Sequence, residues 1–269
     1  MNAGLFQIRA LTLALITCIS TIFGCNRSNP SIEGAYELIR SRYGDSAFNG
    51  KQAANRKTIK VIKDGHWMVA TFAGTQMITV ERAFGGKYTL HGDSCLETLD
   101  FSSEEASELG TTSISTYRAD KKYLQLNRKN APPGCRDCPS EETYSRFNPD
   151  GQLLDTSMEG AWYHRESEWF GQKTEDPDYI NVKLYAYPRF AWASYHLEGK
   201  DFIGVGGGTY HFDGKKLVEH LEYFSFYDII PGDEKIDVTR LSPGSVSMVN
   251  TGSAGKEIYD KFKPSPIPK

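Results

Sequence analysis

Short stretches of alternating apolar and polar positions dominate this chain. The clearest example is the segment 204–224, in which GVGGGTYHF and KKLVEHLEYF surround the dipeptide Asp213-Gly214. Asp and Gly tolerate the positive φ of a tight hairpin turn, so the segment predicts two antiparallel strands. Similar runs divided by Gly, Asp, Asn and Pro recur along the chain, and helical periodicity is nearly absent. The pattern is typical of an antiparallel barrel or sandwich.

The strand pattern occurs twice because the sequence contains an internal repeat. EGAY at 33–36 returns as EGAW at 159–162, and GGKYTLHG at 85–92 matches GGTYHFDG at 207–214. Four matching blocks keep their order at offsets between 115 and 126 residues, which chance similarity would not do. The repeat predicts two duplicated domains that fold independently. The predicted divisions are a signal segment 1–24, a tether 25–30, a first domain 31–147, a linker 148–158, a second domain 159–264 and a tail 265–269.

The N-terminal segment has the pattern of an export signal. Arg9 precedes an uncharged stretch at 10–23, whose 14 residues fall short of the roughly 20 that span a bilayer. The run IFGC at 22–25 resembles the lipobox of bacterial lipoproteins, in which the cysteine is acylated and becomes the first residue. We therefore expect a cleaved signal and a lipid anchor on Cys25, with an ordinary secretory signal as the alternative. By the same resemblance, Asn26 favours the outer membrane, with the protein facing the periplasm.

Charge and composition narrow the class of protein. Cleavage after Gly24 would leave 245 of the 269 residues, with 30 basic and 34 acidic side chains and a net charge near −4. Such a balance attracts neither nucleic acid nor anionic lipid. The aromatic content of 12% and the 25 glycines favour β structure with tight turns.

The hairpin around Asp213-Gly214 predicts which side chains point inward. A turn centred on this dipeptide pairs Tyr210 with Leu217 and Gly208 with Glu219, and directly opposed residues share a face. The predicted inward residues are Gly208, Tyr210, Phe212, Leu217, Glu219, Leu221 and Tyr223, and in the first copy Gly86, Tyr88, Leu90, Cys95, Glu97, Leu99 and Phe101. Burying the carboxylates of Glu97 and Glu219 is costly. Either an internal Arg, Lys or Tyr satisfies each one, or the interior holds water and a ligand.

The second copy also carries a family resemblance. Its runs EGAW, RFAWASY and GVGGGTYHFDGKKLVEHLEYFSF resemble the lipocalin-like domains of bacterial lipoproteins, and Tyr36 stands where that pattern has a tryptophan. The resemblance implies an all-β chain of two tandem antiparallel lipocalin-like β-barrels, whose mouths admit a small hydrophobic or amphipathic ligand. This fold class includes carriers, inhibitors, structural proteins and a few enzymes, so the fold alone does not decide function.

We expect the second barrel to be the better binding site because its inward positions are more aromatic. An aromatic wall with one carboxylate suits a ligand with an apolar body and one cationic or hydrogen-bonding group, which Glu219 would orient. The candidate ligand-binding residues are Glu219, Tyr210, Phe212, Tyr223, Phe190 and Trp192, together with Glu97 and Tyr88 in the first barrel.

Other chemistry-bearing residues favour structural roles. Cys135 and Cys138 form a CxxC flanked by prolines and outside any βαβ pattern, which favours a disulfide formed after export; pairing of Cys95 with either is the alternative. The histidines do not cluster at ligand spacing, so no metal or cofactor is expected. No nucleophile elbow and no phosphate-binding glycine loop with lysine occurs in the sequence.

These features support three hypotheses. The favoured one is a cell-envelope lipoprotein that binds a small hydrophobic or amphipathic ligand in a barrel cavity, with no nucleic-acid partner. The first alternative is a structural lipoprotein with filled barrels that contacts envelope proteins. The second is a hydrolase or isomerase that uses Glu219 as an acid or base.

Overall fold

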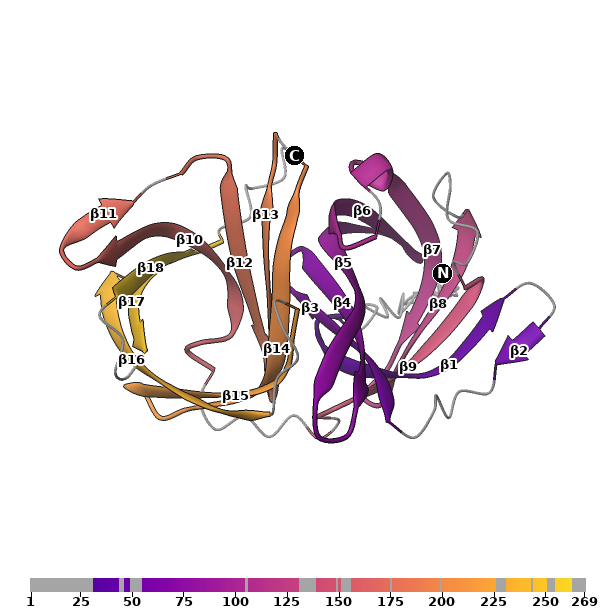
Figure 1. The fold of residues 1–269 in the computed structure, drawn as a ribbon. Helices are drawn as coiled ribbons and strands as arrows, with labels where there is room; N and C mark the ends of the chain where they lie inside the picture. Colours follow the sequence, from indigo (N-terminus) through magenta and orange to yellow (C-terminus); the bar gives the residue numbers. More distant parts are fainter. Residues whose placement is uncertain are drawn as a thin grey trace, which may run out of the picture.

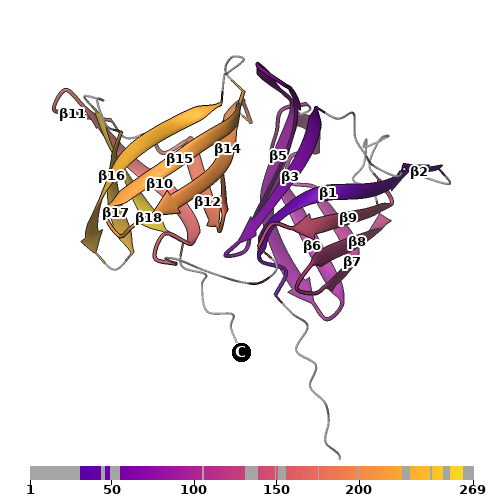
Figure 2. The same cartoon turned by 90° about the horizontal axis from the view of Figure 1, so that it is seen from below.

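The fold is all-β and consists of two closed barrels that lie side by side (Figures 1 and 2). The computed structural model describes residues 31–43, 46–48, 55–104, 106–130, 139–148, 150, 156–174, 176–198, 200–225, 231–242, 244–250 and 255–262. All strand pairs in both sheets are antiparallel, and each sheet closes by pairing its first long strand with its last. The predicted class of two tandem antiparallel β-barrels is confirmed.

Barrel 1 is built from the first copy of the repeat. Its strands are β1 (Gly34–Tyr43), β2 (Ser46–Phe48), β3 (Arg56–Lys63), β4 (His66–Gly74), β5 (Ile78–His91), β6 (Ser94–Ser102), β7 (Thr112–Ala119), β8 (Tyr123–Asn130) and β9 (Glu141–Arg146). A short 3-10 helix, η1 (Ala106–Glu108), follows β6. The barrel closes between β1 and β9, whereas β2 pairs with β1 alone, so eight strands form the ring.

Barrel 2 repeats this plan strand for strand. Its strands are β10 (Gly160–Trp169), β11 (Gln172–Thr174), β12 (Tyr179–Ala186), β13 (Arg189–His196), β14 (Phe202–Phe212), β15 (Lys216–Phe224), β16 (Gly232–Ser242), β17 (Ser245–Asn250) and β18 (Gly255–Lys261). It closes between β10 and β18, with β11 paired with β10 alone.

An aromatic side chain near the start of the first strand helps to fill the interior of each barrel. Trp162 donates its indole N–H to the carbonyl oxygen of Met158 at 2.8 Å, and the Lys261 ammonium lies 5.5 Å from the centroid of the Trp162 ring. In barrel 1, Tyr36 donates to the carbonyl of Ile32 at 2.7 Å and Arg146 covers its ring. The segment just before each barrel therefore belongs to that barrel's core, although Met158 falls in the predicted linker.

The turn after β14 differs from the predicted register. Phe212 pairs with Leu217, Tyr210 with Glu219 and Gly208 with Leu221, so the predicted pairing was wrong by two residues. The Asp213 carboxylate accepts hydrogen bonds from the backbone N–H groups of residues 215 and 216, at 2.9 and 2.7 Å, which moves the centre of the turn one residue along the chain. A register shift of two residues leaves each side chain on the same face of the sheet, and Tyr210, Phe212 and Leu217 do face the interior.

A β-bulge reverses the predicted direction of the last residues in this hairpin. The register of β14 against β15 shifts between Gly207 and Gly208, so Gly207 pairs with Tyr223 while Gly208 pairs with Leu221. The extra residue turns Tyr223 out of the barrel and Phe224 into it. Barrel 1 has the same bulge, which turns Phe101 outward. The prediction that Tyr223 and Phe101 point inward was wrong, because a bulge breaks the two-residue alternation.

These outward side chains belong to a buried contact between the barrels. The Phe72 and Tyr223 rings stack with their centroids 4.6 Å apart, and Phe101 stacks on Tyr195 at 5.3 Å. The shared apolar cluster contains Ala35, Ile59, Val61, Met68, Ala70, Phe72, Ile78, Ala83 and Phe101 from barrel 1, and Ala161, Val182, Leu184, Ala186, Ala191, Ala193, Tyr195, Val205 and Tyr223 from barrel 2. This shared cluster packs the two copies together in the folded protein, and independent folding of each copy stays a prediction.

Polar groups fix the edge of this contact. His66, buried in barrel 1, hydrogen-bonds through Nε2 to the Tyr163 hydroxyl of barrel 2 at 2.6 Å, and burial lowers the pKa of His66. Lys63 forms ion pairs with Glu33 at 3.1 Å and with Glu159 at 2.9 Å. The Lys63–Glu159 ion pair and the His66–Tyr163 hydrogen bond thus connect the two barrels at this edge.

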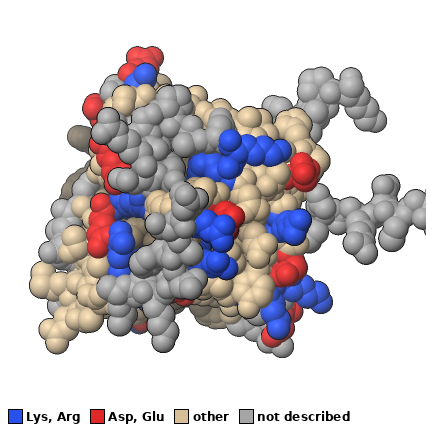
Figure 3. Space-filling view, turned by 90° about the vertical axis from the view of Figure 1, so that its right-hand side faces the viewer, with Lys and Arg blue, Asp and Glu red and all other residues tan. Residues whose placement is uncertain are grey.

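The outer surface carries both signs of charge. On the face of barrel 1 seen in Figure 3, basic and acidic side chains alternate in small groups. The described part of the chain contains no helix with the length and apolarity to cross a membrane. Cys25, Cys135 and Cys138 lie outside the described residues, so the lipid anchor and the disulfide remain predictions.

Candidate functional site: two cavities above buried lysine-glutamate pairs

Each barrel contains a buried lysine-glutamate ion pair at the same place in the repeat. In barrel 1, Lys60 on β3 donates to Glu97 on β6 at 2.5 Å, and their side chains are 2% and 4% exposed. In barrel 2, Lys183 on β12 lies 3.3 Å from Glu219 on β15, with 11% and 2% exposure. Desolvating both partners is costly, so each charge requires the other.

The pair in barrel 2 has an additional hydrogen-bond donor. The Tyr185 hydroxyl donates to Oε1 of Glu219, and Lys183 reaches both carboxylate oxygens. Burial by itself would lower the pKa of Lys183, but the charges of Glu219 and then Glu257 raise it above its ordinary value. Burial, reinforced by Glu219, raises the pKa of Tyr185 well above its usual range. Glu219 thus has internal partners, Lys183 and Tyr185, which was one of the two outcomes open from the sequence.

A tyrosine from the closing strand completes the array in both barrels. Lys60 lies 5.6 Å from the centroid of the Tyr144 ring, and Lys183 lies 5.6 Å from that of Tyr259. Tyr144 donates to Glu142 at 2.9 Å, and Tyr259 donates to Glu257 at 3.0 Å. The same lysine, tyrosine and two glutamates therefore stand in both copies.

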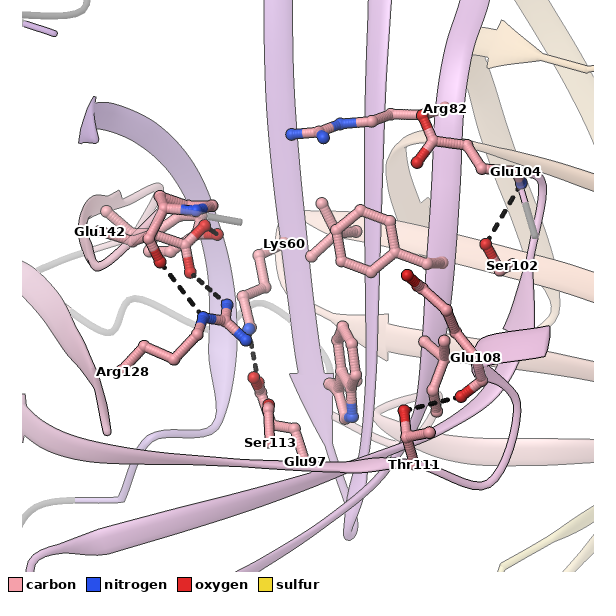
Figure 4. Close-up of a pocket in the computed structure, with 16 residues that line it drawn as sticks. Lys60, Arg82, Glu97, Ser102, Glu104, Glu108, Thr111, Ser113, Arg128 and Glu142 are labelled. Carbon is pink, nitrogen blue, oxygen red and sulfur yellow. Dashed lines mark hydrogen bonds and ion pairs between the residues drawn. The ribbon is translucent and has the colours of Figure 1, made fainter. Parts of the chain in front are cut away.

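Above each array the barrel is open and contains a cavity. Cavity 1, in barrel 1, holds about 730 Å³ of space counted out to its mouth. Its apolar wall consists of Trp67, Val69, Phe84 and Leu99, and Figure 4 shows Lys60 and Glu97 below Arg82. Cavity 2, in barrel 2, holds about 600 Å³, with Tyr179, Trp192, Leu221, Phe224 and Tyr259 among its lining residues.

The two cavities differ in charge because two positions of the repeat have diverged. The residue opposite the buried glutamate on the next strand is Ser113 in barrel 1 and Glu234 in barrel 2. Arg128 of barrel 1, which pairs with Glu142 at 3.4 Å, is replaced by Asn250 in barrel 2. The described lining of cavity 2 thus contains Lys183 against the carboxylates of Glu219, Glu234 and Glu257. Burial, and then the charge of Glu219, raise the pKa of Glu234 above its ordinary value.

The predicted ligand-binding residues fall into three groups. Glu219 and Trp192 line cavity 2, and Glu97 lines cavity 1. Phe190, Tyr210 and Phe212 pack in the filled part of barrel 2, and Tyr88 packs against the corresponding cluster of barrel 1. Tyr223 lies outside, in the contact between the barrels. The glycine expected across from each buried carboxylate is instead a tyrosine, Tyr88 or Tyr210.

Sequence reasoning missed the cations of both cavities. Lys60 and Lys183 each interrupt an apolar run, IKVI at 59–62 and VKLY at 182–185, at matching positions of the repeat. A charged residue kept inside two matching buried strands is a signal that the sequence did contain. Arg82 and Glu234 carry no such signal, because each occurs in one copy alone.

The described part of the chain contains neither a disulfide nor a metal-binding cluster. Cys95 is buried in barrel 1 without a disulfide partner among these residues, and burial raises the pKa of its thiol to about 12. Across the same residues, no three His, Cys, Asp or Glu side chains are grouped so as to hold a metal ion.

The comparisons with known proteins show similarity to a solved structure but not to a known family. No protein-family model and no curated protein matches the sequence. The fold is similar to the crystal structure of the uncharacterized protein YLR301w from Saccharomyces cerevisiae, with a TM-score of 0.45 and 9% sequence identity. The match covers 86% of this chain and 99% of the yeast chain. The function is therefore inferred from the interiors of the two barrels.

Proposed function

We propose that this protein is a lipid-anchored binding protein of the bacterial cell envelope that holds a small amphipathic ligand in cavity 2. The observation that carries the proposal is the open half of barrel 2, about 600 Å³ lined by aromatic rings and by more carboxylates than cations. Aromatic faces and uncompensated carboxylates attract a positively charged group, while the rings accept an apolar body. The ligand is therefore an organic cation with an apolar part.

Glu234 takes the role that the sequence suggested for Glu219. Glu219 is engaged by Lys183 and Tyr185, so neither cation binding nor acid-base chemistry is open to it until that ion pair separates. Glu234 lines the same cavity directly opposite Glu219 and forms no ion pair or side-chain hydrogen bond with another described residue. Like charges facing each other across two strands repel, and a bound cation relieves that repulsion.

Binding of naphthylethylamine tests the proposal. Isothermal titration of the full chain without its signal segment should show binding that weakens about tenfold in Glu234→Gln, the typical loss for one charge-assisted hydrogen bond. The uncharged analogue naphthylethanol should bind both proteins equally. Glu37→Gln, on the outer face of barrel 1, makes the same charge change and should leave binding unaltered. Equal affinity of the amine for the wild type and Glu234→Gln would overturn the role of Glu234.

The pH dependence of the same titration has a definite sign. The cation binds the deprotonated carboxylate, and the pKa of Glu234 lies above its ordinary value of 4.5. Affinity for naphthylethylamine should therefore rise as the pH rises through the pKa of Glu234 and then level off. Glu234→Gln should lose most of this rise.

The envelope location depends on Cys25. Cys25→Ser should abolish incorporation of labelled fatty acid and leave uncleaved precursor, because the thiol that accepts the lipid is gone. The measurement is metabolic labelling followed by gel analysis, with wild type as the reference. Labelled fatty acid in the Cys25→Ser protein would contradict the lipid anchor and leave the binding proposal standing.

A further inference from the structure

We propose that cavity 1 is a second binding site with the opposite preference, for an amphipathic carboxylate, and that Arg82 binds the charged group. The site lies in a different barrel from cavity 2 and is argued from different residues. It can therefore be confirmed or refuted independently of the cation-binding site proposed in cavity 2.

Arg82 is the cation of cavity 1 that the protein leaves uncompensated. Lys60 pairs with Glu97 at 2.5 Å, and Arg128 pairs with Glu142 at 3.4 Å. Arg82 lines the same cavity without an ion pair to any described residue, and its Nε is buried without a hydrogen-bond acceptor. A buried donor without an acceptor costs free energy, which an incoming carboxylate would recover.

The position of Arg82 suits an amphipathic ligand. Its guanidinium carbon lies 5.7 Å from the centroid of the Phe84 ring, and Figure 4 shows the side chain extending across the upper part of the cavity. Trp67, Val69 and Leu99 also belong to the apolar wall, and the Lys60 ammonium lies 4.7 Å from the centroid of the Trp67 ring. A short or flat apolar body fits against this wall while its carboxylate reaches the guanidinium.

The repeat shows that this cation is specific to barrel 1. Arg82 pairs with Thr71 across β4 and β5, and the corresponding pair in barrel 2 is Ser194 with Gly204. Barrel 2 therefore has no side chain at the position of Arg82. The two copies of the repeat thus differ in charge at the positions of Glu234 and Arg82: the glutamate occurs only in cavity 2, and the arginine occurs only in cavity 1.

Two acidic residues that line cavity 1 would repel a bound anion and so weaken its binding. Glu104 and Glu108 also line the cavity, and Glu104 is exposed on the segment after β6. Glu104→Gln should accordingly strengthen binding of an anion, a change opposite in sign to that of removing Arg82.

The test is isothermal titration of the full chain without its signal segment, using naphthylacetate and the uncharged naphthylethanol. Arg82→Met should weaken naphthylacetate about tenfold or more, since it removes a charge-assisted hydrogen bond. Naphthylethanol should change by less than about twofold. Arg118→Met, on the exposed face of β7, is the matched control and should bind naphthylacetate as the wild type does. Arg82→Lys keeps the charge without Nε and should fall between wild type and Arg82→Met.

Each outcome decides the inference. Equal binding of naphthylacetate by wild type and Arg82→Met, or no binding by wild type, overturns it. If naphthylethylamine still binds in a Glu234-dependent way, the function proposed for cavity 2 survives that failure. A melting temperature measured for every variant separates lost binding from lost folding. Stronger binding of naphthylacetate by Glu104→Gln would support the site through a variant in which Arg82 is unchanged.

Discussion

Glu219→Gln is expected to lower the free energy of unfolding by about 3–5 kcal/mol, the usual cost of stranding a buried charge. The substitution keeps the size of the side chain and an acceptor for Tyr185, but it leaves the Lys183 ammonium buried without a counter-ion. Urea unfolding monitored by circular dichroism measures the loss. Glu198→Gln, an exposed glutamate in the turn after β13, is the control and should change stability by less than about 0.5 kcal/mol.

A double-mutant cycle separates the ion pair from the general effect of substitution. Lys183→Met combined with Glu219→Gln removes both charges, so the double variant should be more stable than the sum of the single losses predicts, by about 0.5–3 kcal/mol. Because the folded pKa of Lys183 is raised above 10.5, its contribution is complete below that pH and is lost only as the pH rises through the higher folded value. Near-neutral pH is therefore the condition to use. Additive losses would mean that the two charges do not depend on each other.

Ala193→Asp is expected to destabilise both barrels together by about 3 kcal/mol or more, because it places an unpaired carboxylate in the apolar contact between them. Ala193 is 0% exposed and belongs to the shared cluster. Hydrogen exchange read by mass spectrometry reports the two barrels separately. Faster exchange should appear in β3 and β4 of barrel 1 as well as in β12 and β13 of barrel 2.

Phe170→Asp provides the control for this result. Phe170 is 85% exposed between β10 and β11, so the same added charge should leave exchange in both barrels unchanged. If Ala193→Asp affects barrel 2 alone, the copies unfold separately, as their sequences suggested. By the same reasoning, a fragment covering barrel 2 alone would expose Tyr195, Val205 and Tyr223, and we expect it to aggregate.

The sequence by itself determined the duplication, the strand pattern and much of the interior. Alternation with a period of two is a local property, so it placed Tyr210, Phe212 and Leu217 inside barrel 2 even though the turn was misplaced by one residue. It also placed the carboxylates of Glu97 and Glu219 inside. Matching blocks kept in order predicted two copies of one barrel, because a repeat of that length forms the same strands twice.

Only the tertiary structure decided what those side chains meet. A bulge at Gly207 and Gly208 turned Tyr223 outward, and the register of distant strands, not any local pattern, brought Lys183 to Glu219. The charge of each cavity likewise depends on residues from separate strands, such as Arg82 and Arg128 in cavity 1. The packing of the barrels on each other is non-local in the same way, since an outward apolar position on a strand does not reveal which surface covers it.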